Sequence, residues 1–227
     1  MTAWLTRSLA EVPAGDDWLG ASERAVLGRL TLVKRRSEWR LGRYTAKAAA
    51  AAFLEVEDAR IEVVASPGGA PVAVLDGARA ELELSLSHRA GRAVAVVAPP
   101  GPPIGCDIEL VEPRSDAFVR QWFAEGERAL LDAAPSDERP WLANLIWSTK
   151  EAATKAIGEG LRLGVARARV TLDLGETAPG TDGWRPLRVR WGEDGGMVQH
   201  GWFRREPEWV ITVVGGDSRT RPPRRMA

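Results

Sequence analysis

Apolar positions recur along the chain with two periods, and together they predict an α+β fold. Helical spacing and residues of high helix propensity predict helices over residues 34–54, 118–133 and 141–157. Alternating or continuous apolar runs predict an early strand and further strands at residues 61–64, 82–86, 93–98, 104–110, 169–174, 187–191, 197–204 and 209–214.

A proline-rich turn at residues 99–103 separates two similar sets of elements. Each set places one long alanine-bearing helix before antiparallel strands. This order predicts a pseudo-twofold tandem duplication, each half a long helix packed on an antiparallel sheet. The predicted halves are residues 1–103 and 104–217. Residues 218–227 are polar and basic with two adjacent prolines, and we expect them to form a disordered tail.

The composition excludes several classes of function. The 227 residues include 31 basic and 31 acidic side chains, so no net charge favours nucleic acid or an anionic membrane. The single cysteine, Cys106, excludes an intramolecular disulfide and a cysteine-based zinc site. The N-terminal residues lack the pattern of a secretory signal, and no apolar run is long enough to span a bilayer. We therefore expect a cytoplasmic protein.

Carboxylates and lysines gather in two short stretches about forty residues apart. Asp107 and Glu109 lie two positions apart on the predicted strand 104–110, so both side chains share one face. Glu151 and Lys155 lie one turn apart on the predicted helix 141–157, and Lys150 lies beside them. Hard oxygen ligands of this kind suit Mg²⁺. The alternative interpretation is that they are solvated charges and an ordinary pair on a helix surface.

Basic residues also follow one face of the first predicted helix. Arg36, Arg40, Arg43 and Lys47 fall at offsets of four, seven and eleven. By itself such a stripe is most often a solvated helix face. Guanidinium groups also bind phosphate through two parallel hydrogen bonds, so the stripe is equally suited to a densely anionic ligand.

Three motifs in order carry a resemblance to a known family. They are Ser-x-Ser-His-x-x-Gly at residues 85–91, Gly-x-Asp-x-Glu at 105–109 and Trp-x-x-Lys-Glu-Ala-x-x-Lys at 147–155. Their order and spacing resemble the 4′-phosphopantetheinyl transferases, specifically the larger surfactin-synthetase-activating (Sfp-like) class. Larger members of that class are pseudo-twofold monomers and usually serve secondary metabolism, such as polyketide or nonribosomal peptide biosynthesis.

The resemblance implies an activity and a set of site residues. The enzyme would transfer the 4′-phosphopantetheine arm of coenzyme A to a serine of an acyl or peptidyl carrier protein, releasing adenosine 3′,5′-bisphosphate. Asp107, Glu109 and Glu151 would hold Mg²⁺. Glu151 would also accept the proton of the carrier serine, directly or through a metal-bound water, while Lys150 and Lys155 would bind the pyrophosphate and assist its departure.

The resemblance also implies where coenzyme A binds. His88 and Ser87 would contact its 3′-phosphate, together with Arg43 and either Arg35 or Arg36. Arg36 is the candidate named for this position. Ala70 stands where the family often has a lysine that reaches a coenzyme A phosphate.

Residues 118–124 resemble the family's carrier-docking region, although their aromatic side chains are equally suited to a core.

Two alternatives share these residues. One is a non-catalytic paralogue that binds coenzyme A or a carrier protein without transfer, which the alanine at position 70 would favour. The other is a Mg²⁺-dependent pyrophosphohydrolase that uses water as the nucleophile. Motif order and spacing favour the transferase over both.

Overall fold

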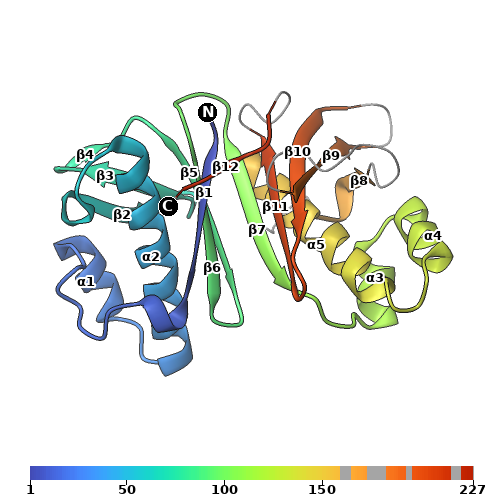
Figure 1. Cartoon of the computed structure of the whole chain (residues 1–227), viewed down its shortest axis with the longest axis horizontal. Coiled ribbons are helices and arrows are strands. Elements are labelled where there is room, and N and C mark those ends of the chain that lie inside the picture. Colours follow the sequence, from blue (N-terminus) through green and yellow to red (C-terminus); the bar gives the residue numbers. More distant parts are fainter. Residues whose placement is uncertain (159–164, 173–182, 193–195, 216–220, 227) are drawn as a thin grey trace.

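Two antiparallel sheets lie at the centre of the molecule, and each carries one long helix on its outer side (Figure 1). The computed structural model describes residues 1–158, 165–172, 183–192, 196–215 and 221–226. Helix and sheet are both abundant, which confirms the α+β class. Within these ranges no helix is both long and apolar enough to cross a membrane.

The N-terminal half contains a four-stranded sheet, a small three-stranded sheet and the long helix α2. The sheet orders are β12-β1-β6-β5, in which β12 (Arg224–Arg225) comes from the C-terminal end of the chain, and β2-β3-β4. The elements are β1 (Ala3–Ser8), α1 (Ala21–Leu27), α2 (Val33–Leu54), β2 (Ile61–Ala65), β3 (Pro71–Leu75), β4 (Ala78–Arg79), β5 (Glu83–Arg89) and β6 (Arg92–Ala98), with 3₁₀ turns at Leu9–Glu11 and Asp58–Arg60.

The C-terminal half contains a five-stranded sheet in the order β7-β11-β10-β9-β8 and the long helix α5. The elements are β7 (Ile104–Leu110), α3 (Asp116–Trp122), α4 (Glu125–Ala133), α5 (Arg139–Ala156), β8 (Ala168–Leu172), β9 (Trp184–Trp191), β10 (Val198–Arg205) and β11 (Trp209–Gly215), with a 3₁₀ turn at Val165–Arg167. Each half thus has a long helix on an antiparallel sheet, while the duplication itself stays a prediction.

Small residues let each long helix lie close to its sheet. On α2, Ala46, Ala49 and Ala50 are completely buried against the first sheet. On α5 the close approach is made at β7, where a Cβ atom placed on Gly105 would lie only 1.9 Å from the carbonyl oxygen of Ala152. Glycine is therefore required at this position by packing, and the sequence motif alone does not reveal that reason.

A third apolar cluster joins the two sheets face to face. It is built from β1, β6, β7, β9 and β11, and its completely buried members include Trp4 and Trp184, whose rings meet edge to face at 5.4 Å. The two halves therefore share a core, and β7 lies directly against β5. The amide of Cys106 donates to Ser85 Oγ across this contact, at 2.9 Å.

Two expectations about the elements need correction. The helix expected over residues 118–133 is two helices, because Phe123 and Ala124 adopt extended backbone and Phe123 turns into the core. The tail expected to be disordered is ordered over residues 221–226: β12 (Arg224–Arg225) pairs in parallel with β1, and Met226 packs on the α2 core. The chain end thus returns to the N-terminal sheet. Part of the strand expected at 169–174 lies outside the described residues.

Candidate functional site

Asp107 is the centre of the candidate site. Gly105 and Asp107 share the face of β7 that packs on α5, and Asp107 is 2% exposed. Its Oδ1 atom accepts hydrogen bonds from Lys155 Nζ at 2.8 Å and from Ser87 Oγ at 2.7 Å. Its Oδ2 atom is buried and has no hydrogen-bond partner among the described residues. The three sequence motifs therefore meet at one carboxylate.

Glu109 lies further along the same face and is held by arginines that the motifs do not include. Its Oε2 atom lies 2.9 Å from Arg114 Nη2 and 3.6 Å from Arg89 Nε. Arg114 is fixed in turn, because its Nε donates to Asn144 Oδ1 at 2.8 Å. Burial, together with repulsion from Asp107, raises the pKa of Glu109. Neither arginine stands out in the sequence as a site residue.

Glu151 faces the same cluster from α5. Burial raises the pKa of Glu151 to about 7, and repulsion from Asp107 and Glu109 adds to this effect, while Lys155 opposes it. The Glu151 Oε2 atom lies 4.0 Å from Lys155 Nζ. The three carboxylates predicted from the sequence therefore act on one another electrostatically, as a shared anionic site requires.

The donor set suits a hard dication. A buried carboxylate oxygen without a partner and two carboxyl groups with raised pKa values are what a Mg²⁺ ion would stabilise. Within the described residues, however, no group of three or more histidine, cysteine or acidic side chains forms a ready-made metal site. The ligand set therefore stays a prediction.

Lys155 is the cation of this cluster. Its Nζ donates to Asp107 Oδ1 and to the carbonyl oxygen of Cys106, at 2.9 Å. Burial opposes its charge, but Asp107 and the neighbouring groups outweigh burial and raise the pKa of Lys155. The ammonium group therefore stays charged beside Asp107.

Lys150 is not part of the cluster. It is completely buried on another face of α5, where Nζ lies 2.9 Å from Glu127 Oε2 and donates to the carbonyl oxygen of Ala168. Burial lowers the pKa of Lys150, and Glu127 opposes that effect. The adjacent position in the motif suggested a common site with Glu151, but the helix turns the two side chains apart.

A cavity of about 460 Å³ lies between α2 and the end of β5. His88 lines it together with residues of the first two turns of α2 and the residue before them, namely Leu32, Lys34, Arg35, Glu38 and Trp39. Arg35 is the arginine at this cavity. Arg36 instead donates to the carbonyl oxygen of Leu27 at 2.7 Å, so the position of Arg35 favours it as the candidate phosphate ligand.

Most of the basic stripe on α2 is occupied by structural contacts. Arg40 pairs with Asp16 at 2.9 Å, and Lys47 pairs with Glu23 at 3.0 Å. Arg43 differs, because its Nε is buried and has no hydrogen-bond partner among the described residues, while its guanidinium lies 5.0 Å from the centre of the Trp39 ring. Arg43 thus reaches the cavity only through Trp39, one of the residues that line it.

His88 connects the cavity to the carboxylates. Burial lowers its pKa, Lys155 and Arg43 lower it further, and Glu38 and Asp107 oppose them. The pKa of His88 is therefore affected by charged side chains on both long helices, α2 and α5. Ser87, expected at the phosphate, donates instead to Asp107 in this structure.

The segment 118–124 is mainly structural. Phe118 and Trp122 pack on the ring of Trp147 with centroid distances of 4.8 Å and 5.7 Å, and Phe123 is buried. The aromatic side chains thus belong to the core between α3 and α5, and Arg120 and Gln121 are the exposed residues of the segment.

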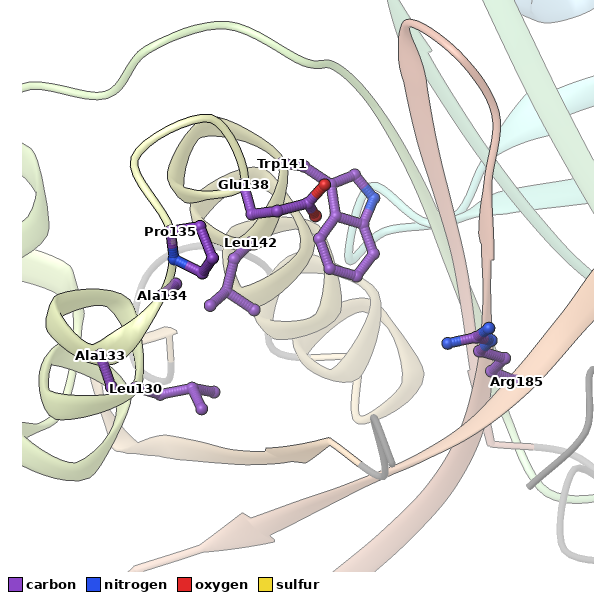
Figure 2. A pocket seen from close by; sticks show the side chains of 8 residues that line it. All are labelled: Leu130, Ala133, Ala134, Pro135, Glu138, Trp141, Leu142 and Arg185. Carbon is purple, nitrogen blue, oxygen red and sulfur yellow. The ribbon is translucent and has the colours of Figure 1, made fainter. Parts of the chain in front are cut away.

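A second cavity lies far from these groups, at the N-terminal end of α5. It measures about 360 Å³ and is mostly apolar, with Arg185 of β9 facing Trp141 across it (Figure 2). None of the residues singled out from the sequence lines it, so the candidate site is the one that Asp107 defines.

The chain combines an α+β fold with a lysine-paired carboxylate cluster and a nearby cavity lined by basic side chains, and it is similar to known proteins. The sequence model of the 4′-phosphopantetheinyl transferase superfamily matches residues 103–194. The chain is 27% identical over 145 residues to 4′-phosphopantetheinyl transferase HetI of Nostoc sp., a match that covers 63% of this chain and 61% of that relative. Residues 103–194 of this chain are thus similar to the 4′-phosphopantetheinyl transferase superfamily.

Two solved structures are similar at lower levels. One is Helicobacter pylori holo-[acyl-carrier-protein] synthase in complex with coenzyme A, with 23% identity, a TM-score of 0.34 and coverage of 44% of this chain and 99% of that one. The other is the Thermotoga maritima synthase, with 24% identity, a TM-score of 0.35 and coverage of 54% and 74%.

Proposed function

We propose that the protein transfers the 4′-phosphopantetheine arm of coenzyme A to a serine of an acyl or peptidyl carrier protein and releases adenosine 3′,5′-bisphosphate. The observation that carries the proposal is the meeting of Ser87, Asp107 and Lys155, one residue from each motif, at a single buried carboxylate.

The cavity beside α2 supplies the coenzyme A end of the site. His88 and Arg35 line it, and Arg43 lies beside it with a buried Nε that has no hydrogen-bond partner among the described residues. These three cationic or hydrogen-bonding side chains suit the 3′-phosphate. The pyrophosphate then extends from the cavity towards Lys155. Asp107, Glu109 and Glu151 would hold Mg²⁺, which when bound would neutralise charge on the pyrophosphate.

The chain's own residues then account for the transfer step. The carrier serine oxygen forms a bond to the phosphorus attached to pantetheine, and the bond from that phosphorus to the bridging oxygen breaks. Glu151 accepts the serine proton, since its carboxylate faces the cluster where the phosphorus would be attacked. Lys155 stabilises the charge that collects on the departing phosphate.

The test is mass spectrometry of an apo carrier protein incubated with coenzyme A, Mg²⁺ and the enzyme. We expect a phosphopantetheine mass increment on the carrier serine, and a loss of at least about a hundredfold in rate for Asp107→Asn. Hydrolysis of coenzyme A without a carrier would instead support the pyrophosphohydrolase. Coenzyme A binding with no increment on acyl or peptidyl carriers would support the non-catalytic paralogue.

A further inference from the structure

A buried glutamate clamps α5 to its neighbours in the C-terminal half. Glu127 is the third residue of α4, and one of its oxygens accepts from the amide of Ala124, just before that helix, at 2.7 Å. The same oxygen lies 2.9 Å from Lys150 Nζ, and the other oxygen accepts from the amide of Val170 at 2.8 Å. One carboxylate thus joins α4, α5 and β8.

The N-terminal half contains the same arrangement. Glu23 is the third residue of α1 and accepts from the amide of Gly20, just before that helix, at 2.9 Å. The same oxygen lies 3.0 Å from Lys47 Nζ, and the other accepts from the amide of Val63 at 2.9 Å. Here one carboxylate joins α1, α2 and β2.

The correspondence extends to details that packing alone does not impose. Both glutamates hold the same place in their short helices, and Val63 and Val170 are each the third residue of a five-residue strand. All four charged residues are less than 5% exposed. We call these two arrangements, Glu23–Lys47 and Glu127–Lys150, the N-terminal and C-terminal clamps.

Aligning the clamps compares the two long helices position by position. Glu151 and Lys155 follow Lys150 by one and five residues, and the residues at the same offsets from Lys47 are Ala48 and Ala52. The N-terminal helix therefore keeps the clamp and lacks the charged groups of the site. Lys47 is thus a buried lysine at the position of Lys150, on a helix that has alanines in place of Glu151 and Lys155.

We infer that Lys150 is a positioning residue: with Glu127 it fixes α5 in the rotation that presents Glu151 and Lys155 to Asp107, and it does not bind the pyrophosphate. The expected effect of Lys150 on the transfer rate rests on the proposed function, whereas its expected effect on stability does not. Since Lys150 directly precedes Glu151, any rotation of α5 about its axis displaces both residues together.

The physical reason for the clamp is the cost of a lone buried charge. Removing one member of a buried ion pair leaves the other charge without compensation, whereas replacing both members by neutral groups of similar volume is far less costly. For a chain of this size, removing one member of the buried ion pair lowers Tm by roughly 10 °C.

The experiment compares Lys150→Met, Glu127→Gln and the double variant with the matched control Lys47→Met. We expect both single variants at the C-terminal clamp to lower Tm by roughly 10 °C, and the double variant to lose clearly less than their sum. Lys47→Met should lower Tm to a similar extent.

Binding and turnover separate positioning from substrate contact. Well below Tm, calorimetric titration with coenzyme A and Mg²⁺ should give Lys150→Met a Kd within about twofold of wild type, while kcat falls by roughly ten- to a hundredfold because Glu151 and Lys155 are misplaced. Lys47→Met should keep kcat, since α2 does not carry those groups.

A different pattern overturns the inference. Lys150→Met that weakens coenzyme A binding tenfold or more with an unchanged Tm would identify Lys150 as a phosphate ligand, and additive Tm losses would show that no clamp exists. If the wild type transfers nothing to any carrier, the proposed function fails, while the Tm coupling and the coenzyme A affinity still decide the role of Lys150.

Discussion

Replacing Gly105 by alanine tests whether the contact between β7 and α5 sets the geometry of the site. A Cβ atom at this position would lie 1.9 Å from the carbonyl oxygen of Ala152 and 2.7 Å from the backbone nitrogen of Ala156. Both are backbone atoms of α5, so no side chain can rotate to make room. Ordinary contact begins near 3.4 Å, and α5 must therefore move away from β7 by about 1.5 Å.

This displacement acts directly on the groups at Asp107. The Lys155 Nζ atom lies 2.8 Å from Asp107 Oδ1, and a shift of more than an ångström breaks that contact. A misplacement of about 1 Å costs on the order of a hundredfold in rate, and overpacking costs roughly 1–3 kcal/mol of stability. We expect Gly105→Ala to fold with a lower Tm and to lose about two orders of magnitude in kcat.

A matched control separates the loss of stability from the loss of geometry. A Cβ atom at Gly201 would lie 2.4 Å from the carbonyl oxygen of Val213, a similarly severe conflict between β10 and β11. Gly201→Ala should therefore lower Tm comparably while the folded fraction keeps kcat within a few-fold. The assay is carrier modification measured well below both Tm values. Gly105→Ala with near-normal kcat would refute the assignment of the site to this contact.

Three further results are expected. The pKa of Glu151 is raised from 4.5 to about 7, so the folded chain binds this proton more tightly than the unfolded chain. Without Mg²⁺, up to about 3 kcal/mol of the stability present below pH 4.5 is therefore lost as the pH rises through 7. Urea unfolding at pH 5 and pH 8 should show that Glu151→Gln removes this loss. Arg35→Ala should raise the KM for coenzyme A roughly tenfold in steady-state assays, whereas Arg36→Ala should lower Tm without this effect. Deleting residues 221–227 exposes the edge of β1 and the packing site of Met226, and should lower stability by about 1–2 kcal/mol in urea unfolding.

The sequence predicts those elements whose pattern is set by burial. The strand expected at 104–110 and the helix expected at 34–54 agree with β7 and α2 to within a residue. The pattern fails where the local backbone conformation decides, as at Phe123 and Ala124, two residues of extended backbone between two helices. It fails again for β12, because only contact with β1 makes the polar chain end ordered.

The candidate site shows the same limit at the level of side chains. Spacing on β7 and α5 predicts correctly that Asp107, Glu151 and Lys155 influence one another. Spacing does not separate Lys150 from Glu151 and Lys155, because the sequence does not show which elements pack on each face of the helix. The arginines at Glu109 come from a strand end and a loop, so no local pattern connects them to the carboxylate.

The shared core between the halves also determines how substrate reaches the site. The cluster that joins the two sheets includes Trp4, Trp184 and Ile211, each with no exposed surface. Burial of large apolar side chains contributes roughly 1.5–3 kcal/mol each, so separating the sheets across this cluster costs on the order of 10–20 kcal/mol. A hinge between the halves is therefore unavailable on the time scale of turnover. Under the proposed function, coenzyme A would enter through the cavity beside α2, where His88 already lies within the electrostatic influence of Asp107 and Lys155. The side chains proposed to bind its phosphates would then be in place in the folded chain before the substrate arrives.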